Sequence, residues 1–130
     1  MRLLGLDYGT RKIGLAFGDT ELLIASPLDV WILGEEKEFI GRLKELIQTE
    51  EIETVVVGIP KKRSGADTEQ GERHRVFVMS LEQILNIPVA TVDESFTSKE
   101  SQRLRTETGS DVSEDALAAM LILQEYFETL

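Results

Sequence analysis

The sequence contains no cysteine and only one histidine, His74. Without cysteine the chain cannot form a disulfide, offer a thiolate nucleophile or bind zinc through sulfur, and one histidine leaves little for an imidazole site. The side chains that remain for holding a metal are therefore oxygen donors, chiefly Asp and Glu. His74 falls within a helical pattern, and we expect it to lie on the helix surface rather than to bind a metal.

Long apolar runs of the kind that span membranes are also missing. Uncharged stretches such as residues 22–28 and 54–60 are far shorter than the roughly 20 apolar residues that a membrane span needs. No basic and then apolar leader opens the chain, so we expect a cytoplasmic protein without a membrane segment. The length of 130 residues suits one domain, residues 1–130, with a hydrophobic core of its own.

Basic residues are scarce relative to acidic ones, with 14 Lys and Arg against 24 Asp and Glu and a net charge of −10. A chain of this charge is a poor general coat for nucleic acid, because phosphate binding relies on Lys and Arg displacing counterions. The bases are nevertheless concentrated in residues 61–75 and 99–105, and if these stretches share one face, that face can accept a polyanion. The candidate nucleic-acid contacts are Lys61, Lys62, Arg63, Arg73, Lys99 and Arg103.

What the chain does have is an opening segment, LLGLDYGT, that runs from an apolar strand into a carboxylate and a glycine turn. A second apolar run, residues 13–17, begins a few residues later, so two antiparallel strands joined by a tight turn at Gly9 are expected. Asp7 then closes a buried strand. A carboxylate there needs a cation, a hydrogen-bond network or water to offset its lost hydration.

The rest of the sequence alternates strand and helix patterns. Residues 22–33 predict an edge strand, because Pro27 cannot donate a ladder hydrogen bond. The β-branched run 54–60 suits a central parallel strand covered on both faces, and residues 88–93 predict a fifth strand. Helices are expected over 35–50, from a cap at Asp67 through Leu85, over 97–106, and from a capping box at Asp111 and Glu114 through Phe127.

This order predicts an α/β fold with a five-stranded mixed sheet flanked by helices. The first three strands are expected to be antiparallel, and the last two, which follow helices, to lie parallel to the first strand. Ligands of such sheets bind beyond the carboxyl ends of the parallel strands. Those ends carry Asp7, residues 58–60 and the pair Asp93 and Glu94, so three distant segments converge on one rim.

A fourth acid, Asp115, opens the last helix on a face that also carries the small residues Ala118 and Ala119, which would let the helix approach the sheet closely. Carboxylates are ligands for hard cations such as Mg²⁺, and one or two such ions can activate water and steady the leaving oxygen in phosphodiester cleavage. The acids expected to meet at the rim are Asp7, Asp93, Glu94 and Asp115.

Each of these acids also has a purely structural interpretation. Asp7 can cap the backbone amides of the Gly9 turn, and Asp115 can stabilise a helix N-terminus. Asp93 or Glu94 can be a solvated strand end. Their common position on one predicted rim is what favours the functional interpretation.

Four motifs in order then cover almost the whole chain: LGLDYGTRKIGLAFGD at 4–19, VVVGIP at 55–60, VDESFTSKE at 92–100 and DALAAMLILQEYF at 115–127. Together they resemble the YqgF family, bacterial proteins described as pre-16S rRNA nucleases and as Holliday junction resolvases, with an RNase H-like fold. The resemblance implies a nuclease dependent on Mg²⁺ or Mn²⁺ that matures the 5′ end of 16S rRNA, with branched DNA as the other substrate to consider. A monomer and a homodimer are both compatible with the sequence.

The resemblance also implies roles for individual residues. Asp7, Glu94 and Asp115 match the family's catalytic acids, and Asp93 is the alternative or supporting metal ligand. Ser95 stands where the family carries an arginine, which removes one expected phosphate contact.

A non-catalytic RNA- or protein-binding factor in ribosome assembly or transcription is the alternative function, favoured by the net charge of −10. Ser95, in place of the family's arginine, also favours it. The family's lysines before the last acid are replaced here by Asp111 and Glu114, so nucleic-acid affinity on that flank is expected to be weaker or to depend on Lys99, Arg103 and Arg105. The Asp-x-Gly-Thr motif opens phosphate loops of ATPases as well, but the chain is too short for the two-domain clamp of such enzymes.

Overall fold

The computed structural model describes residues 1–60, 69–94 and 113–130. The helix predicted over 97–106 and the predicted cap at Asp67 lie outside these residues. Within them, strands and helices alternate as the hydrophobic periodicity predicts. In chain order they are β1 (Arg2–Tyr8), β2 (Lys12–Asp19), β3 (Ile24–Ile32), α1 (Glu36–Thr49), β4 (Thr54–Pro60), α2 (Glu69–Ile84), β5 (Val89–Glu94) and α4 (Glu114–Phe127).

The strands form one mixed sheet in the order β3-β2-β1-β4-β5, which confirms the predicted arrangement. β1 and β2, and β2 and β3, pair antiparallel, whereas β4 lies parallel to both β1 and β5. β3 is an edge strand, shorter than the predicted 22–33, and its register shifts beside Pro27, which pairs with Ala16. A proline without an amide hydrogen is tolerated at this position because the outer side of an edge strand needs no ladder bond.

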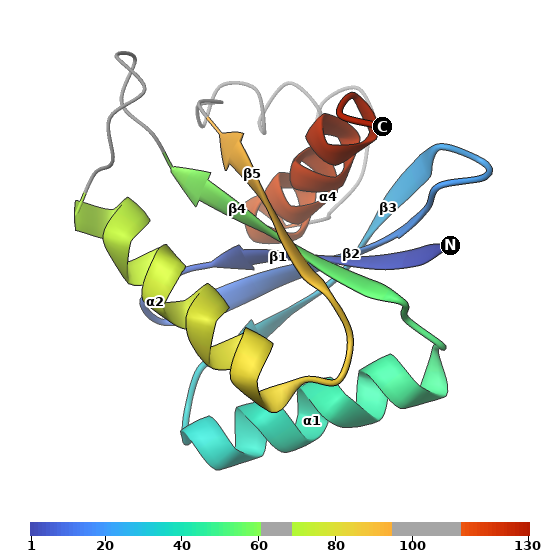
Figure 1. The fold of residues 1–130 in the computed structure, drawn as a ribbon. Helices are drawn as coiled ribbons and strands as arrows, with labels where there is room; N and C mark the ends of the chain where they lie inside the picture. The colour runs from blue at the N-terminus through green and yellow to red at the C-terminus, as the bar shows by residue number, and fades with distance from the viewer. Residues whose placement is uncertain (61–68, 95–112) are drawn as a thin grey trace.

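Helices cover the two faces of the sheet unequally, with α1 and α2 on one face and α4 alone on the other (Figure 1). Side chains of a strand alternate between faces. Leu4 and Leu6 therefore belong to the core under α1 and α2, whereas Leu3 packs in the core under α4. Asp7 has the parity of Leu3, so it projects toward α4. None of the helices in the described part of the chain is long and apolar enough to cross a membrane.

α4 begins at Glu114, and Ser113 is its N-cap residue: the Ser113 hydroxyl accepts a hydrogen bond from the Ala116 amide at 3.4 Å. The predicted capping box of Asp111 and Glu114 is therefore wrong. Glu114 is the first helical residue, which is too early to act as the third-position partner of such a box. The start two residues later places Asp115 in the first turn, beside the sheet.

Gly14 in β2 lets this helix start lie directly on the strand. A Cβ atom at position 14 would overlap the carbonyl oxygen of Asp115, so any larger residue would push the helix N-terminus away. The glycine thus fixes where α4 begins to cross the sheet. It is also the register partner of Asp7 in β1.

Candidate catalytic carboxylate site

Three of the four predicted acids come together at the carboxyl rim of the sheet, on the face covered by α4. Asp7 lies near the end of β1, Glu94 ends β5 and Asp115 lies in the first turn of α4. Because Asp7 pairs with Gly14 and Gly14 contacts the Asp115 backbone, the two aspartates are neighbours across β2. Asp7 interacts electrostatically with both Asp115 and Glu94, so it is the central member of the group.

Glu94 reaches this rim over a second glycine. Gly58 in β4 has no side chain, and a Cβ atom there would lie 2.6 Å from Oε2 of Glu94 and 2.6 Å from Cδ1 of Ile122. The carboxylate therefore occupies space that any other residue at position 58 would fill. Oε2 of Glu94 is buried and has no hydrogen-bond partner among the described residues.

The electrostatics of the site follow from this burial. Loss of hydration, with the charge of Asp115 as a smaller contribution, raises the pKa of Asp7 to about 7. Burial raises the pKa of Glu94 to about 8, with further contributions from Asp7 and Glu125. Among the residues that the structure describes, Asp7, Glu94 and Asp115 form no ion pair. The unpartnered buried oxygen of Glu94 and the nearby carboxylate of Asp7 are of the donor type that hard divalent cations prefer.

The fourth predicted acid, Asp93, is placed differently. It is exposed, and it pairs in register with Ile59, whose side chain packs in the core under α1 and α2. Since paired residues of parallel strands project to the same face, Asp93 points away from the other three acids. Within the described ranges, no three Asp, Glu or His side chains already stand at metal-ligand spacing.

Of the predicted nucleic-acid contacts, only Arg73 can be placed. It is exposed on α2, and therefore lies on the face of the sheet opposite the acids. Lys61, Lys62, Arg63, Lys99 and Arg103 lie outside the described residues. Their proposed contacts with phosphates stay predictions.

The surface position predicted for His74 is wrong, because its side chain is only 2% exposed. Its Nδ1 donates a hydrogen bond to the Gly58 carbonyl oxygen at 2.9 Å, and its ring meets the Tyr8 ring edge-on at 5.2 Å. Burial lowers the pKa of His74, with the Gly58 backbone acting in the opposite direction. His74 lies four residues before the buried Val78 and seven before the buried Leu81, and this helical spacing is the signal that could have revealed its position.

His74 thus supports the site from behind the sheet. Tyr8 directly follows Asp7 in β1, and Gly58 lies under the Glu94 side chain. The buried imidazole of His74 contacts both Tyr8 and Gly58, so it touches one residue beside each of these two acids. The sequence pattern does not predict that Gly14 and Gly58 make room for α4 and for Glu94. A glycine that makes room for a helix on the opposite face leaves no periodic signal in a strand.

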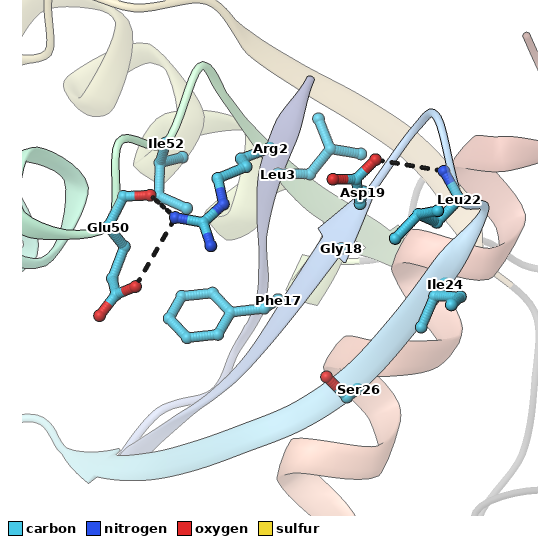
Figure 2. A pocket seen from close by; sticks show the side chains of 10 residues that line it. All are labelled: Arg2, Leu3, Phe17, Gly18, Asp19, Leu22, Ile24, Ser26, Glu50 and Ile52. Atoms are coloured by element: carbon cyan, nitrogen blue, oxygen red, sulfur yellow. Dashed lines mark hydrogen bonds and ion pairs between the residues drawn. The ribbon is translucent and has the colours of Figure 1, made fainter.

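A separate cavity of about 240 Å³ lies at the other end of β1 (Figure 2). Arg2 crosses it to the Glu50 carbonyl oxygen at 2.7 Å, and Asp19 accepts hydrogen bonds from the amides of the β2–β3 turn. Leu3 and Gly18, which pair in register, line its wall. The cavity is therefore at the amino end of β1, away from the acids.

The raised carboxyl pKa values predict how stability depends on pH when no cation is bound. A carboxyl whose pKa rises on folding holds its proton more tightly in the folded state, so its stabilising contribution is full below pH 4 and is lost as the pH rises through about 7 to 8. Glu94→Gln keeps the site neutral at position 94. In EDTA at pH 9 we expect its Tm to exceed that of the unmodified protein by about 4 °C, the effect of roughly 1 kcal/mol in a domain of this size.

Thermal unfolding at pH 5, 7 and 9 measures this effect, with Asp93→Asn as the matched control. It removes the same charge one residue away, from an exposed side chain on the other face. We expect the difference between Glu94→Gln and the control to vanish at pH 5. An equal gain in both variants at pH 9 would mean that net charge, not the buried carboxyl, sets the trend.

Within residues 1–60, 69–94 and 113–130, five strands in this order, three covering helices and a group of carboxylates at the shared rim define an RNase H-like nuclease fold. Solved structures agree: the chain superposes on T. thermophilus RuvC, solved with a Holliday junction substrate, with a TM-score of 0.58, 16% identity and coverage of 99% of this chain and 95% of that one. For the Fowlpox virus resolvase bound to Holliday junction DNA the TM-score is 0.63, at 12% identity and coverage of 99% and 98%. At these identities the likeness concerns the fold alone.

Residues 1–129 match the family described as "RuvX: Holliday junction resolvase", and the chain belongs to this family. Two relatives named "Putative pre-16S rRNA nuclease" illustrate the similarity. The protein of Dictyoglomus turgidum is 33% identical over 135 residues, covering 100% of this chain and 96% of the relative. That of Koribacter versatilis is 37% identical over 132 residues, covering 98% and 86%. The family resemblance inferred from the four motifs is confirmed.

Proposed function

We propose that this protein is a divalent-cation-dependent endonuclease that cleaves phosphodiester bonds at the 5′ end of pre-16S rRNA, with Asp7, Glu94 and Asp115 as its catalytic carboxylates. The observation that carries the proposal is the buried, unpartnered Oε2 of Glu94 beside Asp7, at the rim where α4 delivers Asp115. Such an arrangement is costly in a protein that does not use it. A bound Mg²⁺ or Mn²⁺ offsets that cost.

The position of each of the three acids determines its role at a bound cation. Asp7, on the central strand, faces both of the others and would be shared by any cation bound there. Glu94 lies over Gly58, and the Asp115 backbone lies on Gly14, so the two glycines place both residues near Asp7. A divalent cation at this place supplies Lewis-acid activation of water and of the phosphoryl oxygen. Because protons compete for Asp7 and Glu94, cation binding should strengthen as the pH rises through about 7 to 8.

Names of relatives support RNA as the first substrate to test. Full-length relatives at 33% and 37% identity carry the pre-16S rRNA nuclease name, whereas the resolvases solved with Holliday junctions share 16% and 12% identity. The family description nevertheless includes Holliday junction resolution. Branched DNA is therefore the comparison substrate.

The test is cleavage of three substrates in Mg²⁺ or Mn²⁺: an RNA carrying the 5′ precursor of 16S rRNA, unstructured single-stranded RNA, and a four-way DNA junction. We expect the precursor RNA to be cut at a defined position and at least about tenfold faster than the others, the effect of 1.4 kcal/mol of discrimination. Glu94→Gln should abolish the cut and Asp93→Asn should keep it. Faster cleavage of the junction would reassign the substrate to DNA.

A non-catalytic binding factor remains the second candidate, and the described residues favour it in one respect: no three acids yet stand at metal-ligand spacing. It makes the opposite prediction. RNA binding without cleavage, unchanged by Glu94→Gln and independent of Mn²⁺, would support the binding factor and reject the nuclease.

A further inference from the structure

A groove between α1 and α2 lies on the face of the sheet opposite the catalytic acids. Its volume is about 710 Å³, within the range of sites that hold a ligand or anchoring side chains. The rings of Tyr8 and Phe77 stack at its floor, 4.1 Å between centroids and 5° from parallel, and Phe39 lies 6.0 Å from Phe77. The nuclease chemistry proposed above uses none of these rings.

The wall of this α1–α2 groove is apolar and exposed on the α2 side. Val76 lines it and is 64% exposed, although the helical pattern of the sequence counts this residue among the apolar positions of the helix. Leu33 and Ile40 on the α1 side are partly buried. An exposed apolar surface bordered by polar residues is typical of a site for another protein.

The charged side chains around the groove indicate which kind of partner can bind there. Among the described residues, three carboxylates line it, Glu36 in the first turn of α1 and Glu69 and Glu72 in the first turn of α2, against one guanidinium, Arg73. Nucleic acid is disfavoured here, since phosphates would meet this excess of negative charge. Two helices with an apolar channel between them form the surface on which a third, amphipathic helix can lie.

We propose that the α1–α2 groove binds a basic amphipathic helix of a partner protein. Its apolar side chains enter between Val76 and the stacked rings of Tyr8 and Phe77. Its Lys or Arg side chains pair with the carboxylates that line the groove, Glu36, Glu69 and Glu72. The site is separate from the catalytic rim, so the protein can hold this partner while nucleic acid occupies the other face.

The probe is a synthetic helix of Leu and Lys with one apolar face, labelled with fluorescein and followed by anisotropy at 150 mM salt. A scrambled peptide of the same composition, which has no apolar face, is its control. We expect the amphipathic peptide to bind at least about tenfold more tightly than the scrambled one. Trp31, the only tryptophan, meets Phe39 edge-on at 6.2 Å, so its fluorescence should change on binding.

Two matched pairs of variants locate the binding site. Glu72→Lys should weaken binding about tenfold, whereas Glu82→Lys, the same charge change outside the groove on the same helix, should alter it less than about twofold. Val76→Ser should weaken binding severalfold, and Met79→Ser, which is 59% exposed but does not line the groove, should not. All four side chains are exposed, so we expect each variant to fold.

Three outcomes would overturn the proposal: equal binding of the scrambled peptide, equal damage from Glu82→Lys and Glu72→Lys, or displacement of the peptide by a single-stranded RNA oligonucleotide. The first two would mean attraction to the net charge of −10, and the third would give the groove to nucleic acid. RNA cleavage is measured on the same four variants and should stay within about twofold of the unmodified protein. Failure of this proposal is therefore distinguishable from failure of the nuclease assignment.

Discussion

Replacing Asp7 with asparagine is expected to lower the cleavage rate by more than about 100-fold, because even groups that only support a metal ligand typically contribute 10- to 100-fold. Asp7 interacts with both Glu94 and Asp115, so its replacement removes the carboxylate that links the other two. Asparagine keeps the size and removes the charge. The measurement is single-turnover cleavage of the precursor RNA at saturating Mn²⁺.

Thermal unfolding provides a second readout of the same Asp7→Asn variant. In EDTA at pH 9 the variant should be more stable than the unmodified protein, since a buried charge has been removed, and Mn²⁺ should no longer raise its Tm. Asp29→Asn, at an exposed position of β3, is the control and should behave like the unmodified protein. Undiminished cleavage by Asp7→Asn would reject the active-site assignment, and a retained Mn²⁺ shift would move the cation elsewhere.

The second large effect is expected from Gly14→Ala. The added Cβ overlaps a backbone oxygen of α4 rather than a flexible side chain, so the helix start must move. Overpacking of this kind costs typically 1–3 kcal/mol, and we expect a loss of about 3 kcal/mol, or roughly 12 °C in Tm. Cleavage should fall as well, even at a temperature where the variant is folded, because Asp115 shifts relative to Asp7.

Gly41→Ala is the matched control for this prediction, with the opposite expected sign. Gly41 lies inside α1, and a Cβ there meets nothing within 4 Å. Alanine in a helix interior is favoured over glycine by about 0.5–1 kcal/mol, so this variant should be more stable. Destabilisation of both variants by similar amounts would show that the contact between Gly14 and Asp115 does not determine the position of α4.

The directions of the strands were predictable because hydrophobic patterns, Pro27 and the helix between successive parallel strands restrict the topology to few choices. The face on which each acid lies was not. In β5 the residues before Asp93 and Glu94 are apolar or β-branched at every position. The strand therefore has no alternation of apolar and polar residues that would indicate which carboxylate points toward α4. Register with β4 decides it, and register depends on pairing across distant parts of the chain.

Side chains that meet only in the tertiary structure were also beyond prediction. The spacing of His74 to Val78 and Leu81 indicates a buried helix position, but its hydrogen bond to the Gly58 carbonyl oxygen joins distant segments, and no local pattern predicts that contact. The N-cap residue of α4 is Ser113 and not Asp111, which lies two residues earlier. Several residues that favour the N-cap position are close together in this stretch, and the sequence does not show which one begins the helix. Asp7, in contrast, followed directly from a buried strand that runs into a glycine turn.

His74 is the only histidine in the sequence, and this has a practical use. A protein with a single imidazole yields one set of histidine ring signals in an NMR spectrum, which needs no assignment by mutagenesis. That ring touches the ends of β1 and β4 from behind the sheet, and cannot itself be a ligand on the face of the acids. Its chemical shifts therefore offer a label-free titration curve for the occupation of the carboxylate rim by a cation, without disturbing any residue that binds it.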